Sequence, residues 1–316
     1  MRIVVLAGGV GGSKFLWGLA QEADGDDLTA IVNTGDDIEL HGLRISPDLD
    51  IVTYTLAGMV DSDKGWGIAG DTFECLKILE RYGQPAWFKL GDRDLGTHIF
   101  RTQALREGRR LTQVTDAIRR ALGVRTRILP MTDEAVETHV LVGDGPPHHL
   151  HFQRYLVQRG AVDEIRGIEY RGSARAHPTP EVRAALNEAE GIFIGPSNPV
   201  ASIGPILAVP GIREGLRSSG APIVAVSPVI GGESLKGPTD KFLRWAKVEV
   251  SPLGVARLYH SALAGLDGML IDNGDAEDKR RIEEFGIRVC VGGILMRTPE
   301  QKRLVARAAL KFLEEL

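Results

Sequence analysis

The segments IVVLA (3–7) and TAIVN (29–33) decide the fold, together with the glycine-rich turn that follows the first of them. Both are largely apolar runs, which are typical of strands buried on both faces of a sheet. After the turn, apolar residues recur at helical spacing, which predicts a helix that begins near Gly12 or Ser13. A strand, a helix and a second strand in this order favour parallel strands joined by crossover helices.

The second half of the chain repeats this alternation of strands and helices. It predicts buried strands at 191–195, 222–227, 268–272 and 287–292, and a closing amphipathic helix at 300–316. The middle of the chain differs, with helical patterns at 71–83 and 111–123 and then strand patterns at 125–130, 137–143, 148–157 and 164–172. We expect these middle strands to form an antiparallel or mixed insertion beside the main sheet.

The predicted fold class is therefore α/β, with a doubly wound, mostly parallel sheet and an inserted helical and β subdomain. We expect one domain over residues 1–316. Its core spans about 1–50 and 181–316, and the inserted subregion spans about 51–180.

Composition narrows the class of protein. The 316 residues are 43% hydrophobic and 25% charged, close to the average of soluble globular proteins. The net charge of −4 disfavours non-specific nucleic-acid binding. The two cysteines, Cys75 and Cys290, suit neither a disulfide framework nor a zinc site. No apolar run is long enough to span a membrane, and the opening MRIVVLAGG does not resemble a signal peptide. We expect a cytoplasmic protein.

The first strand leads into Gly8, Gly9, Gly11 and Gly12, followed by Lys14. Glycines let backbone amides approach an anion closely, and the helix N-terminus adds positive partial charge. The spacing matches neither the P-loop nor the dinucleotide fingerprint G-x-G-x-x-G. A phosphate-bearing ligand and a tight structural turn are the two interpretations of this loop.

Polar and acidic residues follow the second strand: Asn33, Thr34, Asp36 and Asp37. Open α/β sheets bind ligands at this carboxyl edge. Adjacent acids there suit a ribose or a hard cation such as Mg²⁺, and the alternative is a solvated turn with an aspartate cap.

A further pair of acids stands at the start of the next predicted helix. Ser46 and Pro47 are typical of the N-cap and the first helical position, which places Asp48 and Asp50 in the first turn. Helix capping alone explains acids at these positions. The high density of acidic residues between Asp36 and the GWG loop around Trp66, however, favours a ligand cleft. In such a cleft a divalent cation would lie between the acids and the phosphates of the ligand.

Three later segments carry polar groups. The run KLGDRD (89–94) is predicted to be a charged turn after a short strand, with Lys89 able to pair a phosphate or a neighbouring acid. Proline-rich loops with Ser197 and Asn198, and with Ser227, follow two successive buried strands. They are suited to hydrogen-bonding a nucleobase or a ribose, or to a structural role. The histidines at 148, 149 and 151 lack the spacing of a zinc site.

Taken together, the motifs resemble those of the 2-phospho-L-lactate transferase family, which acts as a phosphoenolpyruvate transferase in actinobacteria and builds the deazaflavin coenzyme F420. The resemblance covers nearly the whole chain, and it rests on GGVGGSK (8–14), NTGDD (33–37), HGLRISPDLD (41–50), GWGI (65–68), KLGDRDLGTH (89–98), GPSNPVASIGPIL (195–207) and SPVIGG (227–232).

The resemblance implies a Rossmann-like core, a homodimer and a Mg²⁺-dependent reaction. A phospholactyl or enolpyruvyl-phosphoryl group passes from a guanosine diphosphate conjugate to the terminal ribityl hydroxyl of the deazaflavin Fo, and GMP leaves. The resemblance does not decide between lactate and enolpyruvate.

The resemblance also implies roles for individual residues. Asp50, Lys89 and Trp66 would contact Fo. Asp36 and Asp50 would hold the metal, and Asp50 or Asp48 would orient the ribityl hydroxyl or accept its proton. The donor would be held by Gly8, Gly9, Gly11, Gly12, Lys14, Asn33, Thr34, Ser197, Asn198 and Ser227.

Two other classes of protein stay open on the sequence. One is a non-catalytic nucleotide-sugar-binding regulator of the related gluconeogenesis factor branch, which shares the glycine-rich start but not the Fo-side motifs. The other is a nicotinamide-dependent oxidoreductase, which the broken glycine fingerprint disfavours.

Overall fold

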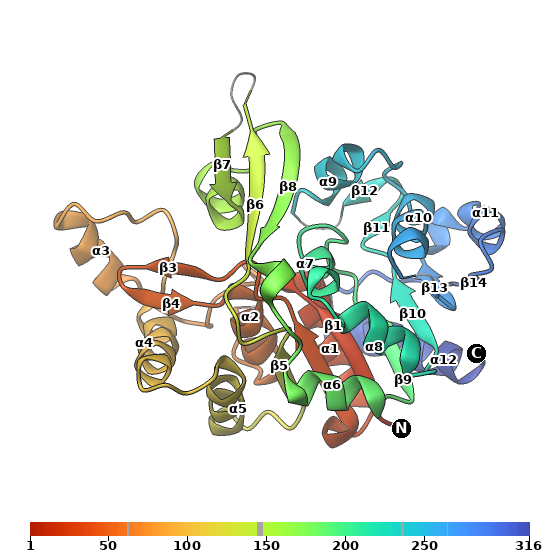
Figure 1. Ribbon diagram of the computed structural model, residues 1–316, viewed down its shortest axis with the longest axis horizontal. Helices are drawn as coiled ribbons and strands as arrows, with labels where there is room; N and C mark the ends of the chain where they lie inside the picture. Colours follow the sequence, from red (N-terminus) through yellow and green to blue (C-terminus); the bar gives the residue numbers. More distant parts are fainter. Residues whose placement is uncertain (62, 144–147, 235–236, 264) are drawn as a thin grey trace.

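The computed structural model describes residues 1–61, 63–143, 148–234, 237–263 and 265–316. A central sheet of seven parallel strands crosses the molecule in the order β14-β13-β10-β9-β1-β2-β5 (Figure 1). These strands are β1 (Ile3–Ala7), β2 (Leu28–Val32), β5 (Arg127–Pro130), β9 (Gly191–Ile194), β10 (Ile223–Val226), β13 (Gly268–Ile271) and β14 (Arg288–Val291). The predicted α/β class with a doubly wound, parallel sheet is confirmed.

Helices cover both faces of this sheet, which explains why its strands are apolar throughout. In β1, Ile3 and Val5 pack on one side and Val4 and Leu6 on the other. The first side is covered mainly by α1 (Gly9–Glu22), α2 (Pro47–Leu56) and α12 (Pro299–Glu314). The second is covered by α6 (Pro180–Asn187), α7 (Ile203–Ala208), α8 (Ile212–Ser218), α10 (Pro252–Leu263) and α11 (Asp278–Glu283).

The order of the strands reverses direction next to β1. From β1 the chain proceeds to β2 and β5 on one side, and it later returns to β9 on the other side. In open α/β sheets a crevice forms at the carboxyl ends of the strands where the order reverses, and ligands bind there. The turns after β1 and β9 border this crevice.

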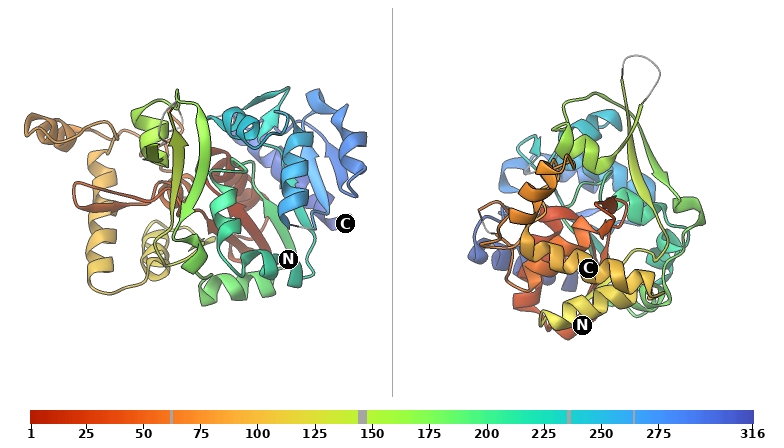
Figure 2. Two further views of the ribbon diagram at one scale, coloured as in Figure 1. Left: turned by 45° about the horizontal axis from the view of Figure 1, so that its top comes forward. Right: turned by 90° about the vertical axis from the view of Figure 1, so that its left-hand side faces the viewer.

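A second, antiparallel sheet stands beyond the carboxyl edge of the first (Figure 1). It consists of β6 (Glu137–Val142), β7 (His148–His151) and β8 (Ile165–Arg171). The hairpin β3 (Ile38–Leu40) and β4 (Leu43–Ile45) and the helices α3 (Glu74–Arg81), α4 (Asp92–Arg106) and α5 (Leu111–Ala121) occupy one side of the molecule, with α3 projecting outward (Figure 2). On the opposite side lie β11 (Val229–Ile230), β12 (Glu233–Ser234) and α9 (Thr239–Trp245).

Several predictions in the middle of the chain are wrong. Residues 127–130 were expected in the insertion but pair in parallel with β2, because Ile128 and Leu129 are both buried between layers. Residues 154–158 form a π-helical turn, not a strand. The expected charged turn at 89–94 is irregular only over 89–91, because α4 begins at Asp92. The short strand expected before it is absent from the described residues 84–88.

Two boundaries near the N-terminus also differ from the prediction. Helix α1 begins at Gly9, inside the glycine run, so the run forms the first helical turn and not a loop before it. The hairpin at 38–45 was not predicted, since each of its strands is only three residues long. Among the described residues, no helix is both long and apolar enough to cross a membrane.

Candidate functional site

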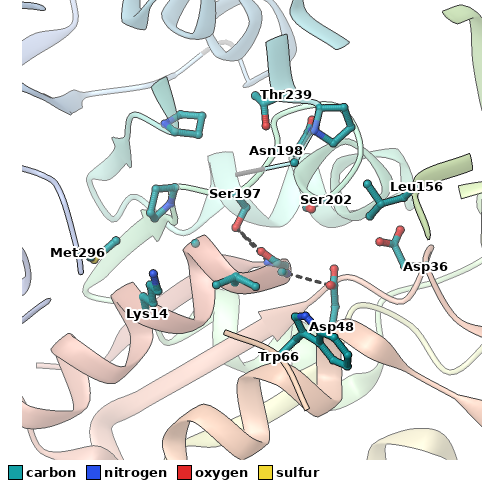
Figure 3. A pocket seen from close by; sticks show the side chains of 18 of the residues that line it. Lys14, Asp36, Asp48, Trp66, Leu156, Ser197, Asn198, Ser202, Thr239 and Met296 are labelled. Atoms are coloured by element: carbon teal, nitrogen blue, oxygen red, sulfur yellow. Dashed lines mark hydrogen bonds between the residues drawn. The ribbon is translucent and has the colours of Figure 1, made fainter. Parts of the chain in front are cut away.

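A cavity of about 490 Å³ opens at the reversal point between β1 and β9 (Figure 3). The N-terminal turn of α1 and the loop after β9 form two of its walls. The cavity brings together nine of the residues that the sequence singled out: Gly8, Gly9, Gly11, Lys14, Asp36, Asp48, Trp66, Ser197 and Asn198. The parallel sheet explains this convergence, because its strands all end at one edge.

The glycines of the first turn are required by close packing. A Cβ on Gly11 would lie 2.2 Å from the carbonyl oxygen of Pro196, and one on Gly12 would lie 2.6 Å from Ser197 Oγ. Gly9 has a φ of +63°, a backbone conformation that glycine adopts without strain. The glycine run therefore lets the start of α1 press against the loop after β9.

Ser197 joins these two segments. Its hydroxyl accepts a hydrogen bond from the Gly8 amide at 3.1 Å and donates one to the Gly8 carbonyl at 2.8 Å. The neighbouring Asn198 uses its Oδ1 to accept from the amides of Val200 and Ala201, both at 2.9 Å. Ser197 thus fixes the loop, and Asn198 keeps its Nδ2 for a ligand.

The N-terminus of α1 carries positive partial charge into the cavity. The amides of the first turn have no helical partners, and the turn contains no acidic side chain. Lys14 lies one turn further along the same wall. Amides, helix dipole and lysine together are suited to bind a phosphate group.

Asp48 faces this turn from the start of α2. Its Oδ1 accepts from the Gly9 amide and its Oδ2 accepts from Asn33 Nδ2, both at 2.9 Å. Burial raises the pKa of the Asp48 carboxyl to about 6. The carboxylate therefore lies beside the phosphate site with a pKa near neutrality, where a group can accept a proton efficiently.

Asp36 stands in the same cavity with an incompletely satisfied carboxylate. It is 3% exposed, and its Oδ1 is buried without a hydrogen-bond partner among the described residues. Burial and then the nearby Asp48 charge raise its pKa well above the usual range for a carboxyl. A cation would remove both penalties, so the residue fits a metal ligand.

The remaining ligands of such a metal would not come from a protein cage. Within the described ranges, no group of three or more His, Cys, Asp or Glu side chains is placed to hold a metal ion. Mg²⁺ is commonly bound by one or two carboxylates, with water and substrate phosphates completing its octahedron. This pattern fits the Asp36 carboxylate, which lines the cavity together with the N-terminal turn of α1.

Asp50 lies outside the lining of the cavity. Arg101 on α4 donates to it from both terminal nitrogens, with Nη1 at 3.1 Å from Oδ2. His98 Nδ1 is 3.7 Å from the same carboxylate. The structure therefore places Asp50 in a buried ion pair and not beside Asp36 in the cavity lining.

Trp66 and Lys89 are neighbours on the other side of the cavity mouth. Trp66 is 41% exposed and lines both the main cavity and a smaller pocket, which Lys89 and Asp94 also line. Trp66 thus lies between the main cavity and a smaller pocket whose lining carries both lysines and aspartates.

Four other predicted donor-binding residues support the site without lining it. Asn33 and Ser227 are fully buried and Thr34 is 1% exposed. Asn33 Oδ1 accepts from the Gly35 amide at 2.7 Å, and the Ser227 hydroxyl is bonded to the backbone of Val229. Gly12 serves packing, as described above.

Nine cavity residues were not predicted from the sequence: Phe152, Gln153, Leu156, Gly237, Pro238, Thr239, Leu295, Met296 and Arg297. The last three follow β14, so the rule that parallel strands present loops at one edge could have identified them. The first three lie in or next to the π-helical turn, which gives no recognisable sequence pattern.

The chain is similar to curated proteins over its full length. A phosphoenolpyruvate transferase from Streptomyces griseus is 46% identical over 100% of this chain and 99% of its own. The enzymes of that name from Mycolicibacterium smegmatis and Thermobifida fusca are each 43% identical, over 98% and 100% of this chain and 98% and 99% of their own. The shared length includes every wall of the cavity.

Solved structures share the fold at low sequence identity. A UPF0052 family protein from Bacillus halodurans matches with a TM-score of 0.64 and 17% identity, over 98% of each chain. At this identity the likeness concerns the fold alone.

The family model described as 2-phospho-L-lactate transferase CofD matches residues 3–288. These residues contain the glycine turn, both aspartates of the cavity and the loops after β9 and β10. The match and the full-length relatives confirm the resemblance found in the sequence, and they exclude a non-catalytic regulator or an oxidoreductase as the leading interpretation. The chain belongs to the 2-phospho-L-lactate transferase family and is an enzyme, a transferase of coenzyme F420 biosynthesis.

Proposed function

We propose that the protein transfers an enolpyruvyl-phosphoryl or phospholactyl group from a guanosine diphosphate conjugate to the terminal ribityl hydroxyl of Fo, with release of GMP. The observation that carries this proposal is the cavity itself, where a helix N-terminus and two buried aspartates meet between β1 and β9. The names of the relatives at 41–46% identity favour the enolpyruvyl donor.

The donor's diphosphate is assigned to the wall formed by Gly8, Gly9, Gly11 and Lys14. Helix amides and a lysine neutralise phosphate oxygens there. Asn198 Nδ2 is available for the ribose or the guanine. Arg297, at the mouth of the same cavity, supplies a further cation for the phosphates.

Fo is assigned to the side of the cavity at Trp66. The exposed indole offers a flat surface on which the deazaflavin rings can stack, and Lys89 lies in the adjoining pocket. The ribityl chain then extends toward Asp48. Asp50 is bonded to Arg101 and does not line the cavity. A direct contact of Asp50 with Fo or a metal would require this ion pair to open.

In the reaction, the ribityl oxygen forms a bond to the phosphorus that carries the three-carbon acid. The bond from this phosphorus to the bridging oxygen breaks, and GMP leaves with that oxygen. Asp48 accepts the hydroxyl proton, for which its pKa of about 6 is suited at neutral pH. The helix amides and Lys14 stabilise the charge on the phosphates.

We assign Mg²⁺ to Asp36, whose unpartnered oxygen fits a cation. When bound, the ion would neutralise phosphate charge and orient the diphosphate. Asp36 would hold the metal, and Asp48 would keep its oxygens for the Gly9 and Asn33 hydrogen bonds and for the incoming hydroxyl.

The testing experiment is an assay of purified protein with Fo, Mg²⁺ and either guanosine donor, followed by mass spectrometry. A product of Fo plus the donor's phosphorylated three-carbon group, together with GMP, is the expected result. The enolpyruvyl donor should give the faster turnover. Binding of both guanosine donors without any product would overturn the proposed reaction.

We also propose that the protein is a cytoplasmic homodimer. Light scattering of the purified 34.3 kDa chain tests the oligomeric state, and a mass near that of one chain at assay concentrations would contradict it.

A further inference from the structure

The loop that carries Asp36 is held by a histidine that the proposed reaction does not use. His151, the last residue of β7, contributes Nε2 at 3.0 Å from the carbonyl oxygen of Asp37. Its Nδ1 accepts a hydrogen bond from the Gln153 amide at 3.2 Å. Since Nδ1 accepts, Nε2 is the nitrogen that carries the hydrogen and donates to Asp37. Both ring nitrogens are therefore engaged.

Gln153 extends from this histidine into the cavity. The side chain is 5% exposed, and its Nε2 lies 3.5 Å from Asp36 Oδ2. Asp36 Oδ1 remains without a partner in the part of the chain that the structure describes. The Gln153 amide thus donates to one oxygen of the Asp36 carboxylate and leaves the other oxygen for a ligand.

The backbone of the same loop has little room to move. The Thr138 amide on β6 donates to the Gly35 carbonyl at 2.7 Å. A Cβ on Gly35 would lie 2.6 Å from Thr138 Oγ1 and 3.0 Å from Pro205 Cβ. The antiparallel sheet therefore contacts the loop through β6 as well as through the end of β7.

We propose that His151 and Gln153 are positioning residues for Asp36. His151 sets the position of the loop backbone, and Gln153 sets the direction of the carboxylate, so that Asp36 Oδ1 points at the cation. Carboxylates that bind metals are commonly oriented by such hydrogen-bonding neighbours, whose loss weakens metal affinity or activity about 10- to 100-fold.

This inference rests on the proposed function, in which Asp36 holds Mg²⁺. It assigns a role to the three-stranded sheet, which contributes no carboxylate to the cavity. The three-stranded sheet acts as a rigid support that fixes the metal ligand from outside the parallel core.

The test measures metal binding directly. Mn²⁺ is titrated into the protein in the presence of GDP, and the relaxation of water protons separates enzyme-bound metal from Mn²⁺–GDP in solution. We expect Gln153→Leu and His151→Leu to raise the Mn²⁺ dissociation constant about 10- to 100-fold. His151→Gln, whose amide can still donate to Asp37, should recover most of the affinity. In turnover, Gln153→Leu should raise the Mg²⁺ needed for half-maximal rate more than it lowers kcat.

Two controls match the substitutions in type and location. Gln158 is exposed at the end of the same π-helical turn. His149 on β7 is paired with Glu169 on β8, and 39% of the His149 side chain is exposed. Gln158→Leu and His149→Leu should leave the Mn²⁺ constant unchanged. Thermal unfolding of each variant identifies any that fails to fold, and Gln153→Asn then replaces Gln153→Leu.

The outcomes separate this inference from the proposed function. Asp36→Asn should abolish Mn²⁺ binding to the enzyme–GDP complex. If it does, while folded Gln153 and His151 variants bind Mn²⁺ like the wild type, the positioning role is wrong. If Asp36→Asn itself binds Mn²⁺ normally, the assignment of the metal to Asp36 is wrong.

Discussion

Arg101 and Asp50 form a two-point ion pair between α4 and α2, and both residues are buried, with exposures of 2% and 6%. Among the described residues the Arg101 Nε atom has no partner, and the Asp50 carboxylate is the principal counter-charge of this guanidinium. A pair of this kind connects the inserted helices to the core next to the cavity.

Removal of one partner should therefore be strongly destabilising. Arg101→Met leaves the Asp50 carboxylate buried beside His98, and breaking such a pair typically costs about 3–5 kcal/mol. Urea unfolding measures the change, and Arg101→Met/Asp50→Asn should recover part of it. Arg244→Met breaks an exposed pair with Asp240 and should change stability by less than about 1 kcal/mol. An Arg101→Met loss as small as that of the control would contradict this view of the pair.

The glycine turn should not tolerate a single methyl group at Gly11. The Cβ of Gly11→Ala would collide with the Pro196 carbonyl, which forces α1 away from the loop after β9. We expect a stability loss of about 1–3 kcal/mol and weaker binding of GDP, followed by calorimetry. Gly96→Ala is the control, because that helical glycine has open space around its Cβ position; it should leave GDP binding intact.

Exchange of Asn33 and Asp48 should separate two contributions of Asp48: its hydrogen bond to Asn33 and its proposed role as proton acceptor. Asp48→Asn places two amide donors opposite each other, since Asn33 Oδ1 is already bonded to Gly35. The double variant Asn33→Asp/Asp48→Asn restores a donor and an acceptor but moves the charge away from the cavity wall. We expect it to unfold at a higher temperature than Asp48→Asn, while turnover stays about 100-fold or more below the wild type. Recovery of turnover in the double variant would exclude Asp48 as the proton acceptor.

Substitution of Trp66 should weaken the binding of Fo and leave the binding of the nucleotide unchanged. Loss of aromatic stacking on a flat heterocycle typically weakens binding by about 1–3 kcal/mol, so Trp66→Ala should raise the KM for Fo at least fivefold with GDP affinity unchanged. Tyr82, which is 75% exposed at the C-terminal end of α3 and does not line the cavity, provides the matched control as Tyr82→Ala. Equal effects of the two substitutions on the KM would refute the placement of Fo at Trp66.

The ion pair of Arg110 with Glu181 should contribute to the dependence of the unfolding free energy on pH in the acid range. The Arg110 hydrogen bond lowers the pKa of the Glu181 carboxyl to about 2, below the value of about 4.3 in an unfolded chain. The stabilisation is therefore complete above pH 4.3 and is lost as the pH falls toward 2. Because both side chains are partly exposed, we expect only about 1 kcal/mol. The difference in unfolding free energy between wild type and Arg110→Gln should fall to zero as the pH is lowered from about 4.3 to about 2. A difference that stays constant with pH would contradict the stabilising role of this ion pair.

The sequence by itself determined the parallel core and the location of the cavity. Apolar runs long enough for buried strands, each followed by glycine or by small polar residues, are local patterns, and parallel strands necessarily end at one edge. It did not reveal that residues 127–130 belong to the main sheet, because four residues with two arginines nearby do not distinguish an edge strand from an inserted one.

Only the tertiary structure decided which aspartate faces the cavity. Asp48 and Asp50 both lie in the first turn of α2. Residues two positions apart in a helix point about 200° away from each other around its axis. Asp48 therefore meets the glycine turn, whereas Asp50 meets Arg101 on a helix about fifty positions along the chain. The sequence contains both carboxylates in one short motif, but their partners come from distant segments, so their roles depend on how α1 and α4 pack against α2.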